Sequence, residues 1–155
     1  MNSGLAQSIA DLSSRWRNLF SRSRKLSSHP KHVRGRAGED AACKFLKKRG
    51  YKVLYRNFKH RGGGEIDIVC RDSETLVFIE VKTRANEDQR RPLEDIKPFQ
   101  KRQITRGAQV WLRMLDDPEI PFRFDVVEVI ADGDDSKPRC ELIQDAFKLS
   151  EPSVY

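Results

Sequence analysis

Two short segments place charged side chains inside otherwise apolar runs, and they constrain this chain more than any other feature. They are the GEIDIV segment at 64–69 and the FIEVK segment at 78–82. Both are rich in Ile, Val and Phe, which predicts β-strands. Because strand side chains alternate between two faces, Glu80 shares a face with Lys82. Burying these groups and Asp67 without partners is costly. A divalent metal ion and a phosphate group would be suitable partners.

The charge of the chain is unevenly distributed along its 155 residues, a length that fits one domain. Up to Arg61 there are 16 Lys or Arg against 3 Asp or Glu, and from Gly62 onward there are 14 against 20. This asymmetry predicts a polyanionic partner for the basic half, either nucleic acid or an anionic membrane surface. The alternative is that the basic half is only a solvated surface.

The cysteines argue against a disulfide framework or a zinc site, because they are three in number and have no C-x-x-C spacing. Cys43 and Cys70 follow apolar residues at the spacing of a buried face, so we expect both in the core. No apolar run reaches 18 residues, and the N-terminus lacks the apolar core of a signal peptide. We therefore expect a reduced, cytoplasmic setting with no transmembrane segment.

The apolar periodicity predicts an α/β fold in a single domain. The three-residue connection at 72–74 makes the second and third strands an antiparallel hairpin, and strict alternation would place Glu65 and Asp67 on one face. Gly50 is a natural stop for the first helix. The predicted order gives a mixed sheet flanked by helices. Helices are expected at 36–49 and 99–115, and strands at 51–58, 65–71, 75–84, 121–131 and 139–144.

Residues 1–32 form a basic extension that precedes the predicted domain at 33–149, and residues 150–155 form a tail. Apolar residues between Leu5 and Phe20 recur at steps of three and four, which predicts an amphipathic helix. A Ser- and Arg-rich stretch then leads to Pro30 as a flexible linker. The extension is either a docking or membrane-surface helix or a weakly ordered tail.

The two acidic strand residues are the chemically informative pair. Asp67 and Glu80 would offer the hard oxygen ligands that Mg²⁺ prefers. The ammonium of Lys82 could orient a water molecule near a phosphodiester and stabilise the developing charge. Glu39 could approach from the first helix and hold a water molecule or a second metal ion, and Lys101 from the second helix could contact the phosphate.

Structural alternatives exist for these acids. Glu39 lines up with Cys43 and Leu46 beside the apolar stripe of its helix, but it could also be a first-turn carboxylate favoured by the helix dipole. Glu80 could form an ordinary surface salt bridge with Lys82, and Asp67 one with a nearby arginine, if this face of the hairpin were open to water. Leu76 and Phe78 share the face with Glu80, which argues against full exposure.

The sequence resembles the YraN-like uncharacterised protein family of bacteria (UPF0102), and the resemblance runs from about Arg34 to Val129. That family is similar to archaeal Holliday-junction resolvases and to restriction-endonuclease-like PD-(D/E)xK nucleases. The resemblance implies a restriction-endonuclease-like fold and phosphodiester cleavage dependent on Mg²⁺ or Mn²⁺. By position, it assigns Glu39 as the helix glutamate, Asp67 as the acidic metal ligand, Glu80 and Lys82 as the E-x-K pair and Lys101 as a basic residue on the following helix. The segments that carry it are Gly35–Glu39, Arg56–Phe58, Gly64–Val69, Val77–Arg84, Lys101 and Arg123–Val127.

Three functions are compatible with these features. The first is a metal-dependent endonuclease that acts on branched or single-stranded DNA, and cutting of two strands would suit a homodimer. The second is a non-catalytic nucleic-acid-binding module with a vestigial nuclease site. The third is a membrane-associated adaptor that uses Trp16 and its neighbours. Phosphate contacts, which give affinity without sequence choice, are expected from Arg34, Arg36, Lys47, Lys48, Lys59, Arg61, Arg84 and Lys101.

Overall fold

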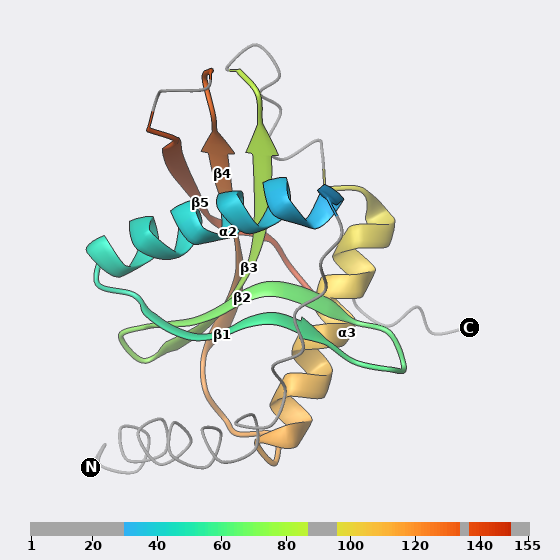
Figure 1. The fold of residues 1–155 in the computed structure, drawn as a ribbon. Helices are drawn as coiled ribbons and strands as arrows, with labels where there is room; N and C mark the ends of the chain where they lie inside the picture. The colour runs from blue at the N-terminus through green and yellow to red at the C-terminus, as the bar shows by residue number, and fades with distance from the viewer. Residues whose placement is uncertain (1–29, 87–95, 134–136, 150–155) are drawn as a thin grey trace.

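A five-stranded sheet with one helix on each face forms the body of the protein (Figure 1). The computed structural model describes residues 30–86, 96–133 and 137–149, with the side chains of residues 30–34 excepted. The elements follow the predicted order of one helix, three strands, a second helix and two strands. They are α2 (Pro30–Lys48), β1 (Lys52–Lys59), β2 (Glu65–Asp72), β3 (Thr75–Arg84), α3 (Pro98–Met114), β4 (Phe122–Ile130) and β5 (Arg139–Phe147).

The sheet is mixed, as predicted, with the strand order β1-β2-β3-β4-β5. β2 and β3 form the predicted antiparallel hairpin, and β1–β2 and β4–β5 are also antiparallel. β3 and β4 are parallel, because α3 lies between them in the sequence and returns the chain to the same end of the sheet. This architecture is consistent with a restriction-endonuclease-like fold.

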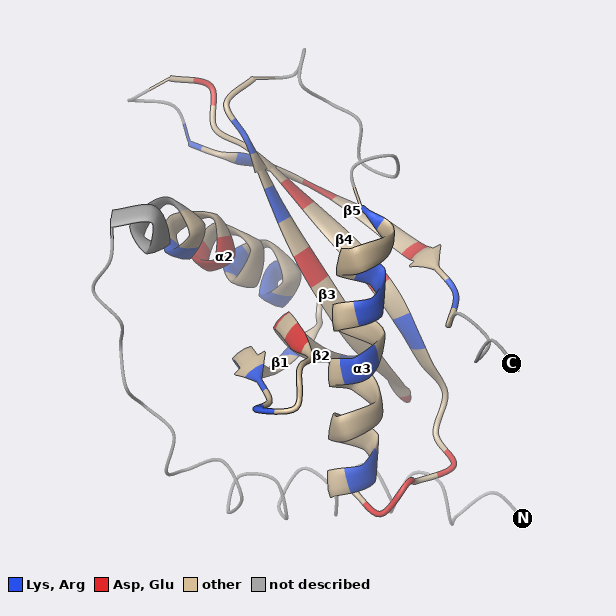
Figure 2. Ribbon diagram, turned by 90° about the vertical axis from the view of Figure 1, so that its right-hand side faces the viewer, with Lys and Arg blue, Asp and Glu red and all other residues tan. Residues whose placement is uncertain are grey.

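Alternate residues of β3 contact the two helices. Val77 and Ile79 pack into the core beneath α2, whereas Leu76 and Phe78 pack into the core beneath α3. The strand residues in both cores are fully or almost fully buried. Figure 2 shows the two helices flanking the sheet. The central strand is therefore covered on both faces, and polar side chains on it need partners within the protein or in a ligand.

The first helix begins earlier than predicted, at Pro30 rather than at residue 36. Proline is well suited to a first helical position, since it has no N–H to leave unbonded. Glu39 consequently lies in the third turn, so the helix-dipole explanation for its position is wrong. Gly50, with φ of 87°, follows the helix end as predicted. None of the described helices is long and apolar enough to cross a membrane, and the predicted helix at 5–20 lies outside the described residues.

The glycine-rich turn between β1 and β2 is packed directly against α3. Gly64 has φ of 106°, and a Cβ atom at this position would lie 2.7 Å from the backbone nitrogen of Gly107. The amide of Gly64 donates to Oε1 of Gln103 at 2.9 Å. Arg106 donates from Nη1 to the carbonyl oxygen of Gly62 at 3.2 Å. Two glycines thus let a turn and a helix from distant parts of the sequence meet backbone to backbone.

Candidate active site

Regular strand alternation is interrupted at Asp67. Ile66 packs in the core beneath α3, whereas Ile68, two residues later, packs beneath α2. The predicted strict alternation through Glu65 and Asp67 therefore does not hold. On the neighbouring strand, Asn57 lies between the residues that pair with Ile68 and Ile66, and its φ is 55°. This left-handed conformation is tolerated by asparagine more readily than by most residues.

Asp67 lies where β2 and β3 cease to pair. The ladder of backbone pairs between these strands ends at Ile68 opposite Ile79. Beyond this point, the amide of Val81 donates to Oδ2 of Asp67 at 2.8 Å. The aspartate carboxylate therefore accepts the hydrogen bond from Val81 that a backbone carbonyl of β2 would accept if the sheet continued. This arrangement brings its carboxylate close to Glu80.

The carboxyls of Asp67 and Glu80 interact strongly. Burial, the neighbouring charge of Glu80 and hydrogen bonding between the two carboxyls raise the pKa of Asp67 to about 7. A hydrogen bond from Val81 opposes this effect without cancelling it. Nζ of Lys82 lies 3.2 Å from Oε1 of Glu80, and both side chains are only about 15% exposed, at 14% and 15%. The site therefore contains a lysine–glutamate pair beside an aspartate that holds a proton near neutral pH.

Glu39 approaches this group from α2, on which its side chain is 13% exposed. Nδ2 of Asn57 donates to its Oε2 at 2.7 Å, and Arg56 lies 3.7 Å from the same oxygen. Burial raises the pKa of Glu39 and the charge of Asp67 raises it further, while the hydrogen bond from Asn57 lowers it. The carboxylate is thus held close enough to Asp67 for their charges to interact.

Gly38 explains how α2 can bring Glu39 so close to β3. A Cβ atom at Gly38 would lie 2.2 Å from Oγ1 of Thr83, so only glycine allows the helix to approach the strand at this point. Thr83 directly follows Lys82, and Gly38 directly precedes Glu39. The close contact between helix and strand is therefore immediately adjacent to two of the charged site residues.

Lys101 is placed differently from the other four candidates. Its Nζ lies 5.8 Å from the centroid of the Phe147 ring, over the last residue of β5. Among the described residues, no contact joins Lys101 to Glu39, Asp67, Glu80 or Lys82. The structure brings the first four predicted residues together and does not bring Lys101, on α3, into contact with them.

The residues predicted to contact phosphate are spread over several elements. Arg61 is exposed in the β1–β2 turn, and Lys59 forms a 2.8 Å ion pair with Glu65. Arg84 lies 3.6 Å from the fully buried carboxylate of Glu128, so its charge is already partly neutralised. Arg36 is half-buried. The side chain of Arg34 lies outside the described part.

The carboxylates of Asp67 and Glu80 suit a hard divalent cation that takes its remaining ligands from water and substrate. Asp67 and Glu80 face each other as carboxylates whose mutual repulsion favours a shared proton, and a cation could replace that proton. Within residues 30–86, 96–133 and 137–149, no three His, Cys, Asp or Glu side chains are already arranged to hold a metal ion. Mg²⁺ commonly takes one or two carboxylates and completes its shell with water and substrate phosphate, so the pair fits this mode of binding.

Asn57 and Gly38 belong to this site but were assigned no role from the sequence. Asn57 carries a detectable signal, since asparagine is depleted in strand interiors and here follows Arg56 in an otherwise strand-like run. Gly38 also carries a signal, since glycine has a low intrinsic preference for helix interiors. Neither signal identifies the partner, because Glu39 and Thr83 become neighbours only through tertiary packing.

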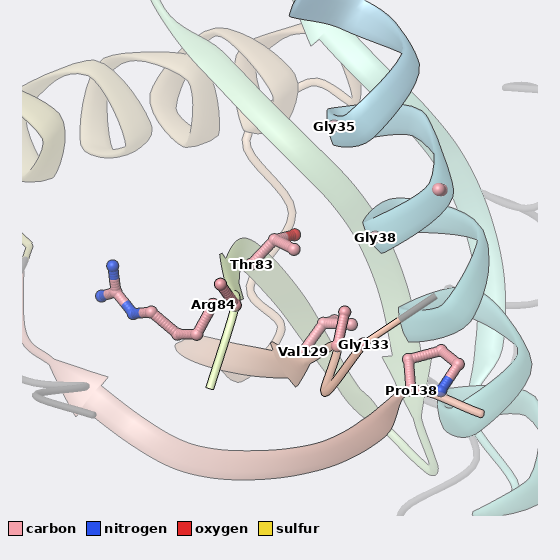
Figure 3. A pocket seen from close by; sticks show the side chains of 10 residues that line it. Gly35, Gly38, Thr83, Arg84, Val129, Gly133 and Pro138 are labelled. Carbon is pink, nitrogen blue, oxygen red and sulfur yellow. The ribbon is translucent and has the colours of Figure 1, made fainter. Parts of the chain in front are cut away.

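A cavity of about 720 Å³ lies between α2 and the ends of β3 and β4 (Figure 3). Gly35, Gly38 and Val129 contribute small or apolar surface, and Thr83 and Arg84 contribute polar groups. No carboxylate lines it. The cavity is therefore not where the acidic residues could hold a cation, although it shares Gly38 and Thr83 with the helix–strand contact beside the site.

Comparisons with known proteins relate this chain to a set of bacterial sequences. The family model described as uncharacterised protein family UPF0102 matches residues 38–129, a range that contains all five candidate site residues. A UPF0102 protein of Geobacter sulfurreducens is 42% identical over 123 residues, which cover 79% of this chain and 94% of the relative. One of Symbiobacterium thermophilum is 44% identical over 113 residues, covering 73% and 94%. One of Prosthecochloris aestuarii is 47% identical over 102 residues, covering 66% and 80%.

Proposed function

The chain belongs to the uncharacterised protein family UPF0102, and we propose that it is a metal-dependent endonuclease that hydrolyses phosphodiester bonds of DNA, branched or single-stranded. The observation that carries this proposal is the group formed by Asp67, Glu80 and Lys82, with Glu39 close by. These residues come from α2, β2 and β3, and the pKa of Asp67 is raised to about 7 within the group. Strongly perturbed carboxyls that meet a lysine are typical of functional sites.

Asp67 and Glu80 would hold Mg²⁺ or Mn²⁺, with Glu39 able to hold a water molecule of the ion's outer shell. When bound, the ion would neutralise charge on a phosphate and lower the pKa of a water molecule. The protein supplies two carboxylates that lose their shared proton on binding, since the cation takes over the role of that proton. The affinity for the ion should therefore decrease as the pH falls below about 7, the pKa of Asp67, because protons then compete with the ion for the carboxylates.

Lys82 and Glu39 have separate tasks in this proposal. The reaction adds water to the phosphorus atom and breaks the bond to one sugar oxygen, which leaves a phosphomonoester and a hydroxyl group. The ammonium of Lys82, fixed by its 3.2 Å pair with Glu80, would stabilise the negative charge that builds up on the phosphate oxygens. Glu39, held by Asn57 at 2.7 Å, would accept a hydrogen bond from the attacking water and orient it.

A cleavage assay tests the proposal. Labelled four-way DNA junctions and single-stranded DNA would be incubated with the full chain and Mg²⁺, Mn²⁺ or EDTA. Cleavage is expected only with metal, and Asp67→Asn and Lys82→Met should each reduce the rate by at least about 100-fold. Glu74→Gln and Lys52→Met remove the same charges from exposed positions and should cut normally. Cleavage that persists in EDTA, or an Asp67→Asn protein that cuts at the normal rate, would refute the proposal.

Metal binding can be followed without activity. Titration of Mn²⁺ by calorimetry should give heat and proton release with the unmodified protein and neither with Asp67→Asn. This measurement separates a failure to bind metal from a failure to recognise the chosen DNA.

The second candidate is a nucleic-acid-binding module without catalysis. It is favoured by the existing pairing of Lys82 with Glu80 and by the lack of a ready three-ligand group among the described residues. Under this alternative the protein would bind DNA and never cut it with either metal. The same cleavage assay therefore decides between the two candidates.

A further inference from the structure

One exposed face of α3 carries an arginine stripe that begins with an aromatic ring. Phe99, Arg102, Arg106, Gln109 and Arg113 follow one another at steps of three and four, so they lie on one side of the helix. All five are exposed, and Phe99 is 61% exposed. The 17 residues of α3 include Lys101 and three arginines but no aspartate or glutamate. The helix is thus a strongly basic element, although it belongs to the half of the chain with net negative charge.

The β1–β2 turn extends this basic surface. Arg61 is exposed in the turn, and the turn is anchored to α3 through the bond from Arg106 to Gly62 and the contact of Gly64 with Gly107. Figure 2 shows blue segments along α3 and in the turn beside it, and no red segment on the helix. We call the surface formed by Arg61, Phe99, Arg102, Arg106 and Arg113 the basic track.

The arginines of the basic track are not neutralised within the described part of the chain. None of the four forms an ion pair there, and Arg106 gives its one hydrogen bond to a carbonyl oxygen. Other cations of the protein are matched with acids. The matched residues include Arg56, Lys59, Lys82, Arg84, Arg123, Arg139 and Lys148. The positive charge of the basic track is therefore available to an external polyanion.

The basic track lies on the same side of the sheet as the glutamate–lysine pair. Glu80 pairs with Val126, which is buried in the core beneath α3, and parallel neighbours point to the same face. From Phe99 to Arg113 the stripe extends for about 21 Å along the helix. A strand bound along it would lie on the outer surface of α3, and therefore on the side of the sheet that α3 covers.

We infer that the basic track binds single-stranded nucleic acid, with the arginines contacting backbone phosphates and Phe99 stacking on a base. Stacking on an exposed aromatic ring requires an unpaired base, which favours a single strand over a duplex. The guanidinium groups are suited to phosphate because their donors form a planar fork. This inference rests on the proposed function, for which it names the form of the substrate that the protein holds on the α3 side of the sheet.

Fluorescence anisotropy with an oligothymidylate of about 15 nucleotides and a hairpin duplex tests the inference. With the full chain and no metal, Arg102→Gln/Arg106→Gln should weaken single-strand binding at least about ten-fold and lower the log–log salt slope by about 1.4. Phe99→Ala should weaken single-strand binding about five-fold or more and leave duplex binding unchanged. The matched control, Lys52→Gln/Lys137→Gln, removes two exposed cations elsewhere and should have a much smaller effect.

Several results would overturn the inference. One is an Arg102→Gln/Arg106→Gln protein with unchanged affinity and salt slope, provided that its thermal melting matches that of the parent. Another is a Phe99→Ala protein that loses self-association in sedimentation while retaining single-strand affinity, since this would identify the ring as a protein contact. Metal-dependent cleavage is measured in a separate assay from binding. Binding without cleavage would refute the catalytic proposal alone, and cleavage that does not depend on the track would refute this inference alone.

Discussion

Two polar clusters on the sheet use the same kinds of side chain in opposite ways. At the start of β4, Arg123 donates from Nε to both oxygens of Asp125 at 3.0 and 3.1 Å, and from Nη2 to Asp72 and Tyr51 at 2.9 Å. The amide of Asp145 also donates to Asp125. Both oxygens of Asp125 thus accept hydrogen bonds from donors within the protein, and in this sense the cluster is complete.

The cluster at Asp67 lies toward the other end of β3 and is not complete. The carboxyls of Asp67 and Glu80 interact there, the charge of Asp67 acts on Glu39, and Lys82 pairs with Glu80. Burial raises the pKa of both Asp67 and Asp125, but Arg123 opposes the effect at Asp125 whereas Glu80 adds to it at Asp67. A buried carboxylate with its cationic partner in place is compensated within the protein, whereas a buried carboxylate beside a second one is not, and the latter arrangement is typical of functional sites.

Changing Asp125 to asparagine should give the largest effect. Asp125 is fully buried, and Asp125→Asn would leave the guanidinium of Arg123 without its main partner. We expect a loss of about 3–5 kcal/mol in the free energy of unfolding, measured by urea denaturation at pH 8. A loss below about 1 kcal/mol would mean that the complete cluster contributes no more than an ordinary surface position.

The same substitution at Asp67 should have the opposite sign. The folded-state pKa of Asp67 is about 7, above its unfolded value of about 3.9. At a pH between these two values, the folded protein keeps a proton on Asp67 that the unfolded protein releases. Stability from this group is therefore present at low pH and is lost as pH rises toward 7. At pH 8 without metal, Asp67→Asn should be more stable than the parent by about 1–2 kcal/mol, and the gain should shrink toward pH 5. Urea denaturation across this range measures the difference, and a gain that does not change with pH would contradict the assignment.

Substitutions of Asn57 should have the smallest effect on stability and distinguish its backbone from its side chain. Asn57→Ala must adopt a left-handed conformation and should lose about 1 kcal/mol, whereas Asn57→Gly avoids that strain. Both remove the hydrogen bond to Glu39 and should slow metal-dependent cleavage about ten-fold. Thermal melting and cleavage rates measured together separate the two effects. Equal melting of both variants would show that the positive φ imposes no strain.

The sequence predicted the helices and strands, because strand alternation and helix periodicity are local properties. The order of elements, the hairpin, the stop at Gly50 and the burial of Cys43 and Cys70 are all confirmed. The positions of Glu80 and Lys82 on one face agree with their ion pair. Each of these features depends on residues only a few positions apart.

Tertiary structure decided how these elements complete the two clusters and the basic track. The break in alternation at Asp67, its hydrogen bond from Val81 and the support of Glu39 by Asn57 require strands and a helix to meet. The arginines of α3 belong to a half of the chain whose total charge is negative, so the charge count did not indicate a basic surface there. They form one surface with the β1–β2 turn because Gly64 contacts Gly107. Contacts between distant segments depend on side-chain packing in three dimensions, and periodicity along the chain carries no record of them.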